Sequence, residues 1–207
     1  MSGEDFLGPI GNASEKYADS NPVTRRLLQR FLARLDDVVA GLAPRSVLDV
    51  GCGEGVVTQR FAALLPDSSV LGLDADDVAL SAEWARRRRD NLAFQVGSGY
   101  ALPFAADSYD VVCAIEVLEH VERPEDVLAE MVRVARRAVV VSVPREPIWR
   151  ISHLLAGRNV SAFGNTPGHI NHWSSRSFCL FASRYGRVEQ AWRPFPWTAV
   201  VIDVRVS

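Results

Sequence analysis

One stretch, residues 47–55, constrains the fold more than any other part of this chain. Four residues of strand character run into glycines at Gly51, Gly53 and Gly55, and an amphipathic run begins at Val56. Glycines at alternate positions allow a turn too tight for side chains, and the helix that follows offers free N–H groups at its start. The stretch therefore predicts a buried parallel strand, a ligand-binding turn and a helix.

The spacing of these glycines separates two classes of nucleotide site. A dinucleotide fingerprint, G-x-G-x-x-G, needs its third glycine where helix and strand pack closely, and counted from Gly51 that position is Val56. The pattern here is D-x-G-x-G-x-G, with Asp49 two residues before the first glycine. Asp74, at the end of the next apolar run, stands at a distance along the chain that suits ribose recognition in either class.

Beyond this stretch the chain alternates between predicted helices and strands. Helices are predicted at 23–41, 54–65, 76–89, 124–136 and 174–185, and strands at 46–50, 69–74, 92–96, 109–114 and 138–143. A strand-like pair, 187–193 and 198–206, follows. Five strands separated by helical segments predict an α/β fold, a Rossmann-like doubly wound sheet that is mostly parallel with a C-terminal antiparallel strand pair.

We expect one domain, 1–207, because a chain of 207 residues is long enough to bury a proper core. Its expected parts are an N-terminal arm and helix (1–44), a cofactor-binding core (45–143), a lid loop (144–173) and a C-terminal helix with antiparallel strands (174–207). The loop leaves the carboxyl end of the fifth strand, the edge where open α/β sheets bind ligands. Long unpatterned loops of this kind are usually functional or disordered, so we expect it to cover the acceptor together with the N-terminal arm.

Composition and charge narrow the class of partner. The formal net charge is −2, so there is no basic excess for a nucleic-acid partner. No apolar run approaches membrane-spanning length, and the acidic start, 1–8, is unlike a signal peptide. The cysteines, Cys52, Cys113 and Cys179, are scattered without a C-x-x-C pairing, which is typical of a reduced compartment. We expect a cytoplasmic protein, and interpret the basic run 86–89 as a solvated helix end, with a phosphate-binding patch as the alternative.

The glycine-rich stretch resembles the nucleotide-binding loop of class I S-adenosylmethionine-dependent methyltransferases. Three further segments are similar to that family in the same order, namely 71–74, 101–112 and the E-V-L-E-H-V segment 116–121. The resemblance covers about 45–145, with a weaker match near 169–173. It implies S-adenosylmethionine as cofactor, and methyl transfer to an oxygen or nitrogen of a small organic acceptor.

The resemblance also implies a set of site residues. Asp74 would hold the ribose hydroxyls, and Ser98 stands where the family commonly has an aspartate that accepts a hydrogen bond from the adenine amino group. The expected cofactor-binding residues are Tyr17, Asp49, Gly51, Gly53, Asp74, Ala75, Ser98, Gly99 and Glu116. An oxygen acceptor needs a base, and histidine suits that role. His120 and His169 are therefore the candidate catalytic residues, although a helix-start residue and lid packing would equally explain them.

Three alternatives remain open from the sequence. A nicotinamide-dinucleotide oxidoreductase would share Asp74, although Val56 and the antiparallel tail speak against it. A non-catalytic S-adenosylmethionine-binding protein would share the whole loop. Finally, a set of four residues is similar to the metal-binding constellation of small-RNA 2′-O-methyltransferases: Glu116, Glu119, His120 and His169. Carboxylates three residues apart would share one face of a helix and suit a divalent ion, but the E-V-L-E-H-V segment also occurs in relatives without a metal, so none is included among the expected cofactors.

Overall fold

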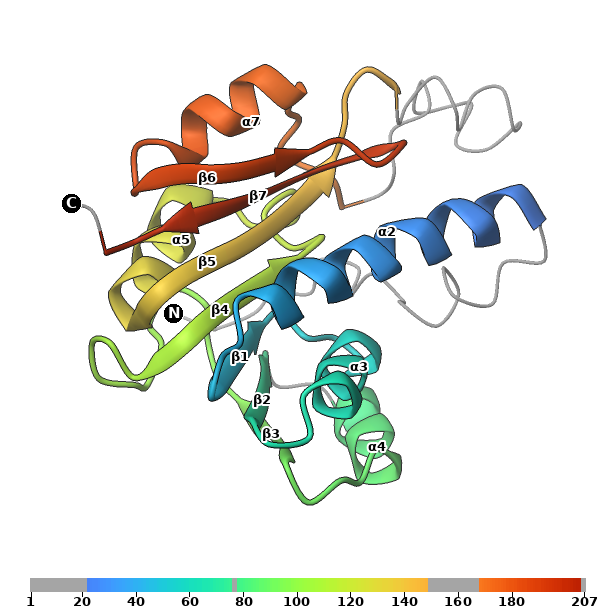
Figure 1. The fold of residues 1–207 in the computed structure, drawn as a ribbon, viewed down its shortest axis with the longest axis vertical. Coiled ribbons are helices and arrows are strands. Elements are labelled where there is room, and N and C mark those ends of the chain that lie inside the picture. The colour runs from blue at the N-terminus through green and yellow to red at the C-terminus, as the bar shows by residue number, and fades with distance from the viewer. Residues whose placement is uncertain (1–21, 76–77, 149–167, 206–207) are drawn as a thin grey trace, which may run out of the picture.

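The computed structural model describes residues 22–75, 78–148 and 168–205. Seven strands form one sheet in the order β3-β2-β1-β4-β5-β7-β6 (Figure 1). The strands are β1 (Ser46–Val50), β2 (Ser69–Asp74), β3 (Leu92–Val96), β4 (Tyr109–Ile115), β5 (Ala135–Pro144), β6 (Arg187–Trp192) and β7 (Trp197–Asp203). The first five run parallel, and β7 is antiparallel to both β5 and β6. The predicted mostly parallel sheet with a C-terminal antiparallel pair is confirmed.

Helices cover both faces of the sheet (Figure 1). They are α2 (Pro22–Gly41), α3 (Val56–Leu64), α4 (Val78–Arg86), α5 (Pro124–Val134) and α7 (Ser175–Ala182). Successive strand residues point to opposite faces, so β4 sends Val111 toward α2 and α3 and Val112 toward α5 and α7. Both residues are fully buried, which explains why the central strands read as unbroken apolar runs.

Some predicted boundaries differ from the observed ones for local reasons. Helix α3 begins at Val56 because Gly55, its N-cap, takes the left-handed conformation. Helix α5 ends at Val134 because β5 begins at the next residue, Ala135, which pairs with Tyr109. The early part of β5 carries two arginines, so its apolar pattern starts only at residue 138. The division of the chain at residues 44, 143 and 173 stays a prediction.

The topology brings three segments to one edge of the sheet. In the order above, the chain leaves β1 toward β2 on one side and β4 lies on the other side, so β1 and β4 form the switch point where open α/β sheets bind ligands. The glycine turn follows β1, and residues 116–121 follow β4. Residues 168–173 join them, because Trp173 pairs with Arg145 just beyond β5 and accepts a hydrogen bond from the N–H of Glu146. Within the described residues, none of the helices has the length and apolar character needed to span a membrane.

Candidate functional site

The glycine turn after β1 is held against the end of β2 by backbone hydrogen bonds. Gly51, Gly53 and Gly55 have φ angles of 72°, 52° and 79°, in the left-handed region that favours glycine. The N–H groups of Gly51 and Cys52 both donate to the carbonyl oxygen of Leu73, at 2.8 and 3.1 Å. The turn therefore keeps one shape, fixed by the neighbouring strand.

The three glycines differ in what surrounds them. A Cβ atom at Gly51 would lie 2.6 Å from a methyl group of Val117, and one at Gly55 would lie 2.5 Å from the ring of Phe94. A Cβ atom at Gly53 would meet nothing within 4 Å. Packing thus excludes side chains at the outer two positions. Gly53 instead faces open space, as a position against which a ligand lies must do.

The carboxylate of Asp74 joins this turn to the end of β2. Its Oδ2 accepts a hydrogen bond from the N–H of Gly53 at 2.6 Å, and its Oδ1 accepts one from the N–H of Ala75 at 2.7 Å. The structure therefore brings together the three predicted cofactor residues Gly53, Asp74 and Ala75, with a carboxylate at the turn.

Asp49 lies beneath the turn, 2% exposed. Burial raises its pKa from the usual 3.8 to about 7; the neighbouring charge of Asp74 adds to the rise, and the hydrogen bond from Thr58 opposes it. The Thr58 hydroxyl donates to Asp49 Oδ2 at 2.7 Å. Cys52 is buried in the turn, and this burial raises the pKa of its thiol above its usual range.

Side chains from the α4 region donate hydrogen bonds to backbone carbonyls of the glycine turn. The indole N–H of Trp84 donates to the carbonyl of Gly53 at 2.8 Å, and its ring stacks on Phe94 with centroids 5.2 Å apart. The guanidinium of Arg87 donates to the carbonyl of Glu54. The interpretation of the basic run as a solvated helix end is therefore wrong for Arg87, whose side chain is 18% exposed. The sequence carried no signal for either contact, because both join segments about thirty residues apart.

The turn after β3 lies next to Asp74. The N–H of Gly97 donates to the backbone carbonyl of Asp74 at 2.8 Å, and a Cβ atom at Gly99 would lie 3.3 Å from a methyl group of Val50. The exposed Ser98 accepts a hydrogen bond on Oγ from the N–H of Tyr100 at 3.2 Å. Ser98 and Gly99 thus stand beside the ends of β1 and β2. Tyr17 lies outside the described residues, as does most of the predicted lid loop, 149–167.

Glu116 follows β4 in a different geometry from the one predicted. Its φ angle is 62°, and its Oε1 accepts a hydrogen bond from the Ser142 hydroxyl at 2.9 Å. Residues 116–120 form a turn and not a helix, so the prediction that one helical turn aligns Glu116 with Glu119 is wrong. The positive φ at Glu116 turns the chain away from helical geometry before Glu119 is reached.

At the end of that turn, Glu119 and His120 come together with His169. The two imidazole rings meet edge to face with centroids 4.8 Å apart, and His120 Nε2 lies 3.9 Å from Glu119 Oε1. Glu119 and His169 are 1% and 4% exposed. Among the described residues these three form a group whose ligand atoms lie within 4.8 Å of one another. Glu116 stands outside this group, so of the four residues considered as an alternative metal site only three lie together.

A backbone contact determines which nitrogen of His120 is basic. Nδ1 lies 3.0 Å from the carbonyl oxygen of Gly168, which can only accept a hydrogen bond. Neutral His120 therefore carries its proton on Nδ1, and the lone pair is on Nε2, the nitrogen near Glu119. Such an imidazole can take up a proton, and the buried carboxylate would stabilise the positive charge that results.

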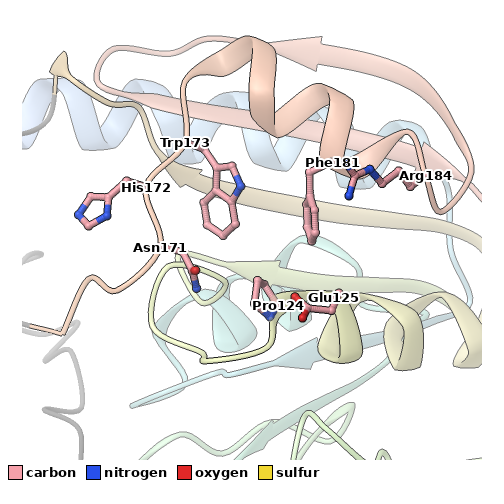
Figure 2. A pocket seen from close by; sticks show the side chains of 7 residues that line it. All are labelled: Pro124, Glu125, Asn171, His172, Trp173, Phe181 and Arg184. Atoms are coloured by element: carbon pink, nitrogen blue, oxygen red, sulfur yellow. The ribbon is translucent and has the colours of Figure 1, made fainter.

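A separate pocket of about 510 Å³ lies between α5 and α7 (Figure 2). Its lining residues are Pro124, Glu125, Asn171, His172, Trp173, Phe181 and Arg184. None of them belongs to the glycine turn or to the group of Glu119, His120 and His169. The pocket is therefore not the place where cofactor and base meet.

Residues 48–142 match the family model described as a methyltransferase domain. The chain is 43% identical over 148 residues to an uncharacterized methyltransferase of Mycobacterium avium, covering 70% of this chain and 53% of that protein. It is 31% identical over 170 residues to the norajmaline N-methyltransferase of Rauvolfia serpentina, covering 76% and 52%. The chain thus spans about half the length of these curated relatives.

A solved structure with a similar fold is magnesium protoporphyrin IX methyltransferase from Synechocystis, with bound SAH. It superimposes with a TM-score of 0.66 at 17% identity, covering 92% of this chain and 91% of that one. At that identity the likeness concerns the fold alone. The match to the family model shows that residues 48–142, which hold the D-x-G-x-G-x-G turn, are a methyltransferase domain, and the fold around it is that of the class I S-adenosylmethionine-dependent methyltransferases.

Proposed function

We propose that this chain transfers a methyl group from S-adenosylmethionine to an oxygen or nitrogen atom of a small organic acceptor. The observation that carries the proposal is the position of His120. It lies in the turn after β4, at the ligand edge of a methyltransferase fold. The contact between its Nδ1 and the carbonyl of Gly168 keeps the proton on Nδ1 and so makes Nε2 the basic nitrogen. The relative from Rauvolfia, named as an N-methyltransferase of norajmaline, also supports an acceptor of this kind.

The cofactor would lie along the glycine turn. Gly53 offers open space on the outer side of the turn, and the Asp74 carboxylate, held by Gly53 and Ala75, is positioned to accept hydrogen bonds from ribose hydroxyls. Asp49 beneath the turn would favour the positive charge that the cofactor carries. The predicted contacts at Gly51, Ser98, Gly99 and Glu116 complete this proposal. When bound, the cofactor supplies a methyl group already activated on a sulfonium, with a thioether as leaving group.

Because the leaving group needs no proton, the chain's own residues have two tasks. They align the acceptor atom with the methyl group and exclude water, and they remove the proton that the acceptor loses. His120 Nε2 takes up this proton, and Glu119, 3.9 Å away, stabilises the imidazolium. The ring of His169, packed edge-on against His120, holds the orientation of the base.

The same three side chains carry a second candidate chemistry. Two imidazoles and a carboxylate suit a borderline divalent ion such as zinc or manganese, which would hold and acidify an acceptor hydroxyl in place of a general base. Treatment with a chelator separates the two. With His120 as the base, chelated enzyme free of metal by elemental analysis keeps full turnover. If turnover is lost on chelation and returns when one divalent ion is added, the three side chains bind a metal and His120 is not a general base.

The proposed function is tested by mass spectrometry of the chain with S-adenosylmethionine and a panel of phenols, catechols, carboxylic acids and amines. We expect demethylated cofactor and singly methylated acceptor in equal amounts, and much less product at the same cofactor concentration from a Gly53→Val control that binds the cofactor weakly. Tight binding of S-adenosylhomocysteine without turnover of any panel member would favour a non-catalytic binding protein. Preference for a nicotinamide dinucleotide would overturn the cofactor itself.

A further inference from the structure

The side chain of Asn171, which Figure 2 labels, is hydrogen-bonded through its amide to the turn that carries His120. The two N–H groups of its Nδ2 donate to the carbonyl oxygens of Leu118, at 3.0 Å, and Val121, at 2.6 Å. These carbonyls lie on either side of Glu119 and His120. One amide group therefore spans the turn and uses both of its donors in doing so.

The backbone adds two further bonds at the same place. The N–H groups of Ile170 and Asn171 both donate to the carbonyl oxygen of Glu119, at 2.8 and 3.1 Å. His169 comes immediately before these two residues. The position of His169 relative to His120 is therefore set by four N–H groups of residues 170 and 171.

We propose that Asn171 is a positioning residue for methyl transfer, which holds the His120 turn against His169 and fixes the direction of the basic Nε2. The proposal rests on the proposed function and adds to it a residue that touches neither cofactor nor acceptor. The amide has a specific part in this. An aspartate would place carboxylate oxygens against two carbonyl oxygens and near the buried Glu119, and an alanine would leave both carbonyls without the donor.

The chain contains a matched control for this arrangement. The amide of Asn91 donates to the carbonyls of Ala62, Leu65 and Ser68, each at 3.0 Å, and so also binds one turn to another segment. Asn91 precedes β3 and Ser68 precedes β2, so this second amide lies at the amino ends of the strands, at the edge of the sheet opposite to the ligand edge. It matches Asn171 in chemistry and differs from it in place.

The experiment compares Asn171→Ala and Asn171→Asp with Asn91→Ala in the full chain. We expect turnover of the acceptor identified by the panel to fall about 10²-fold in both Asn171 variants, because small displacements of a reacting group cost that much. S-adenosylhomocysteine affinity by calorimetry should stay within about twofold of wild type, as a turn bonded elsewhere is unaffected. Asn91→Ala should lower the melting temperature by at least as much and keep wild-type turnover.

A second measurement needs no acceptor. In the complex with S-adenosylhomocysteine, the imidazole NMR signals of His120 and His169 should shift in Asn171→Ala but not in Asn91→Ala. Unchanged signals, or loss of turnover that follows melting temperature equally in both asparagine variants, would overturn the positioning role. If the wild type binds S-adenosylhomocysteine but methylates nothing, the proposed acceptor chemistry fails, and the histidine signals still decide the role of Asn171.

Discussion

The proposed cofactor half and the proposed acceptor half of this site are built in different ways. The turn at Gly51–Gly55 and Asp74 belong to one strand–turn–helix–strand unit and are joined by backbone hydrogen bonds at the ends of β1 and β2. His120 and His169 belong to segments about fifty residues apart, joined by Asn171 and by the contact of His120 with Gly168. A unit formed by neighbouring segments needs particular residue types at fixed spacings, and these can be recognised in the sequence. A site formed by tertiary contact depends on residues that no local pattern identifies.

The difference predicts that the two halves can be damaged separately. The largest effect should come from His120→Gln, which removes the proposed base. We expect turnover to fall by about 10² to 10⁴ with S-adenosylhomocysteine affinity unchanged, because the substitution removes the base and leaves the residues of the glycine turn as they are. Kinetics and calorimetry on the same preparations check this.

The control for that substitution is the exposed His172→Gln, which should keep wild-type turnover. Equal loss of affinity and turnover in His120→Gln would mean that the two halves are one unit. Turnover within about threefold of wild type would remove His120 from the reaction.

Gly53→Val should show the converse pattern. The new side chain would fill the open space at the turn, and we expect S-adenosylhomocysteine affinity to fall about 100-fold, close to 3 kcal/mol. Since φ is 52°, the unfolding free energy should also fall, by about 2 kcal/mol. Gly41→Val is the control, because a Cβ atom there also meets nothing within 4 Å. Equal S-adenosylhomocysteine affinity in both variants would show that the ligand does not bind at the glycine turn.

A third test uses pH to separate the halves. Burial raises the pKa of Asp49 to about 7, so its carboxyl group is neutral at pH 6 and largely ionised at pH 8. If the ionised form favours the ammonium group of the ligand, S-adenosylhomocysteine affinity should rise about tenfold between these values. Calorimetry of wild type against Asp49→Asn, which should show no such rise, checks the assignment.

Substitution of Thr58 provides a second test of the role of Asp49. Its hydrogen bond lowers the pKa of Asp49, so Thr58→Val should move the rise in affinity to higher pH. The free energy of unfolding should change with pH in the opposite direction to the affinity. The folded-state pKa lies above the usual 3.8, so the contribution of Asp49 is fully present below about pH 4 and is lost as pH rises through 7. A rise in affinity that persists in Asp49→Asn would assign it to another group.

The smallest expected effect concerns Trp84. Trp84→Phe keeps a ring on Phe94 but removes the N–H bond to Gly53, and we expect about fivefold weaker S-adenosylhomocysteine binding, the worth of one hydrogen bond. Trp173→Phe, on the acceptor side, should leave affinity unchanged. Ligand-induced change in tryptophan fluorescence should disappear in the first variant and persist in the second. A fluorescence change that persists in Trp84→Phe and disappears in Trp173→Phe would contradict the role of Trp84 at the turn.

The sequence predicted the cofactor half of the fold well because its elements have local causes. The bounds of β2 and β3 are the predicted ones, since apolar runs closed by turn residues mark short buried strands. The start of β5 was missed because Arg136 and Arg137 interrupt its apolar pattern. Arg136 donates a hydrogen bond to Asp110 of the neighbouring strand β4. Local pattern determines a strand's core, and partners elsewhere determine its ends.

The same reasoning explains what was missed in the site. His120 and His169 were proposed from residue type, and the structure places them in contact. The alternative that placed Glu116 and Glu119 on one helical face was wrong, because spacing alone does not reveal the positive φ at Glu116. Trp84 and Asn171 gave no signal, because an indole or an amide that bonds a distant carbonyl looks like any other such residue in sequence.

The strand order has a consequence for synthesis of the chain. Strand β7 pairs with β5 along seven residues, yet more than fifty residues separate them in sequence, and β6 is made in between but lies outside β7. While the ribosome produces residues 145–196, the Val139–Val143 run of β5 has an open edge, a template on which other extended chains can add. A chaperone that binds apolar strands during this interval should raise the yield of folded protein. A stop codon placed before Trp197 should give aggregate in place of a smaller folded enzyme.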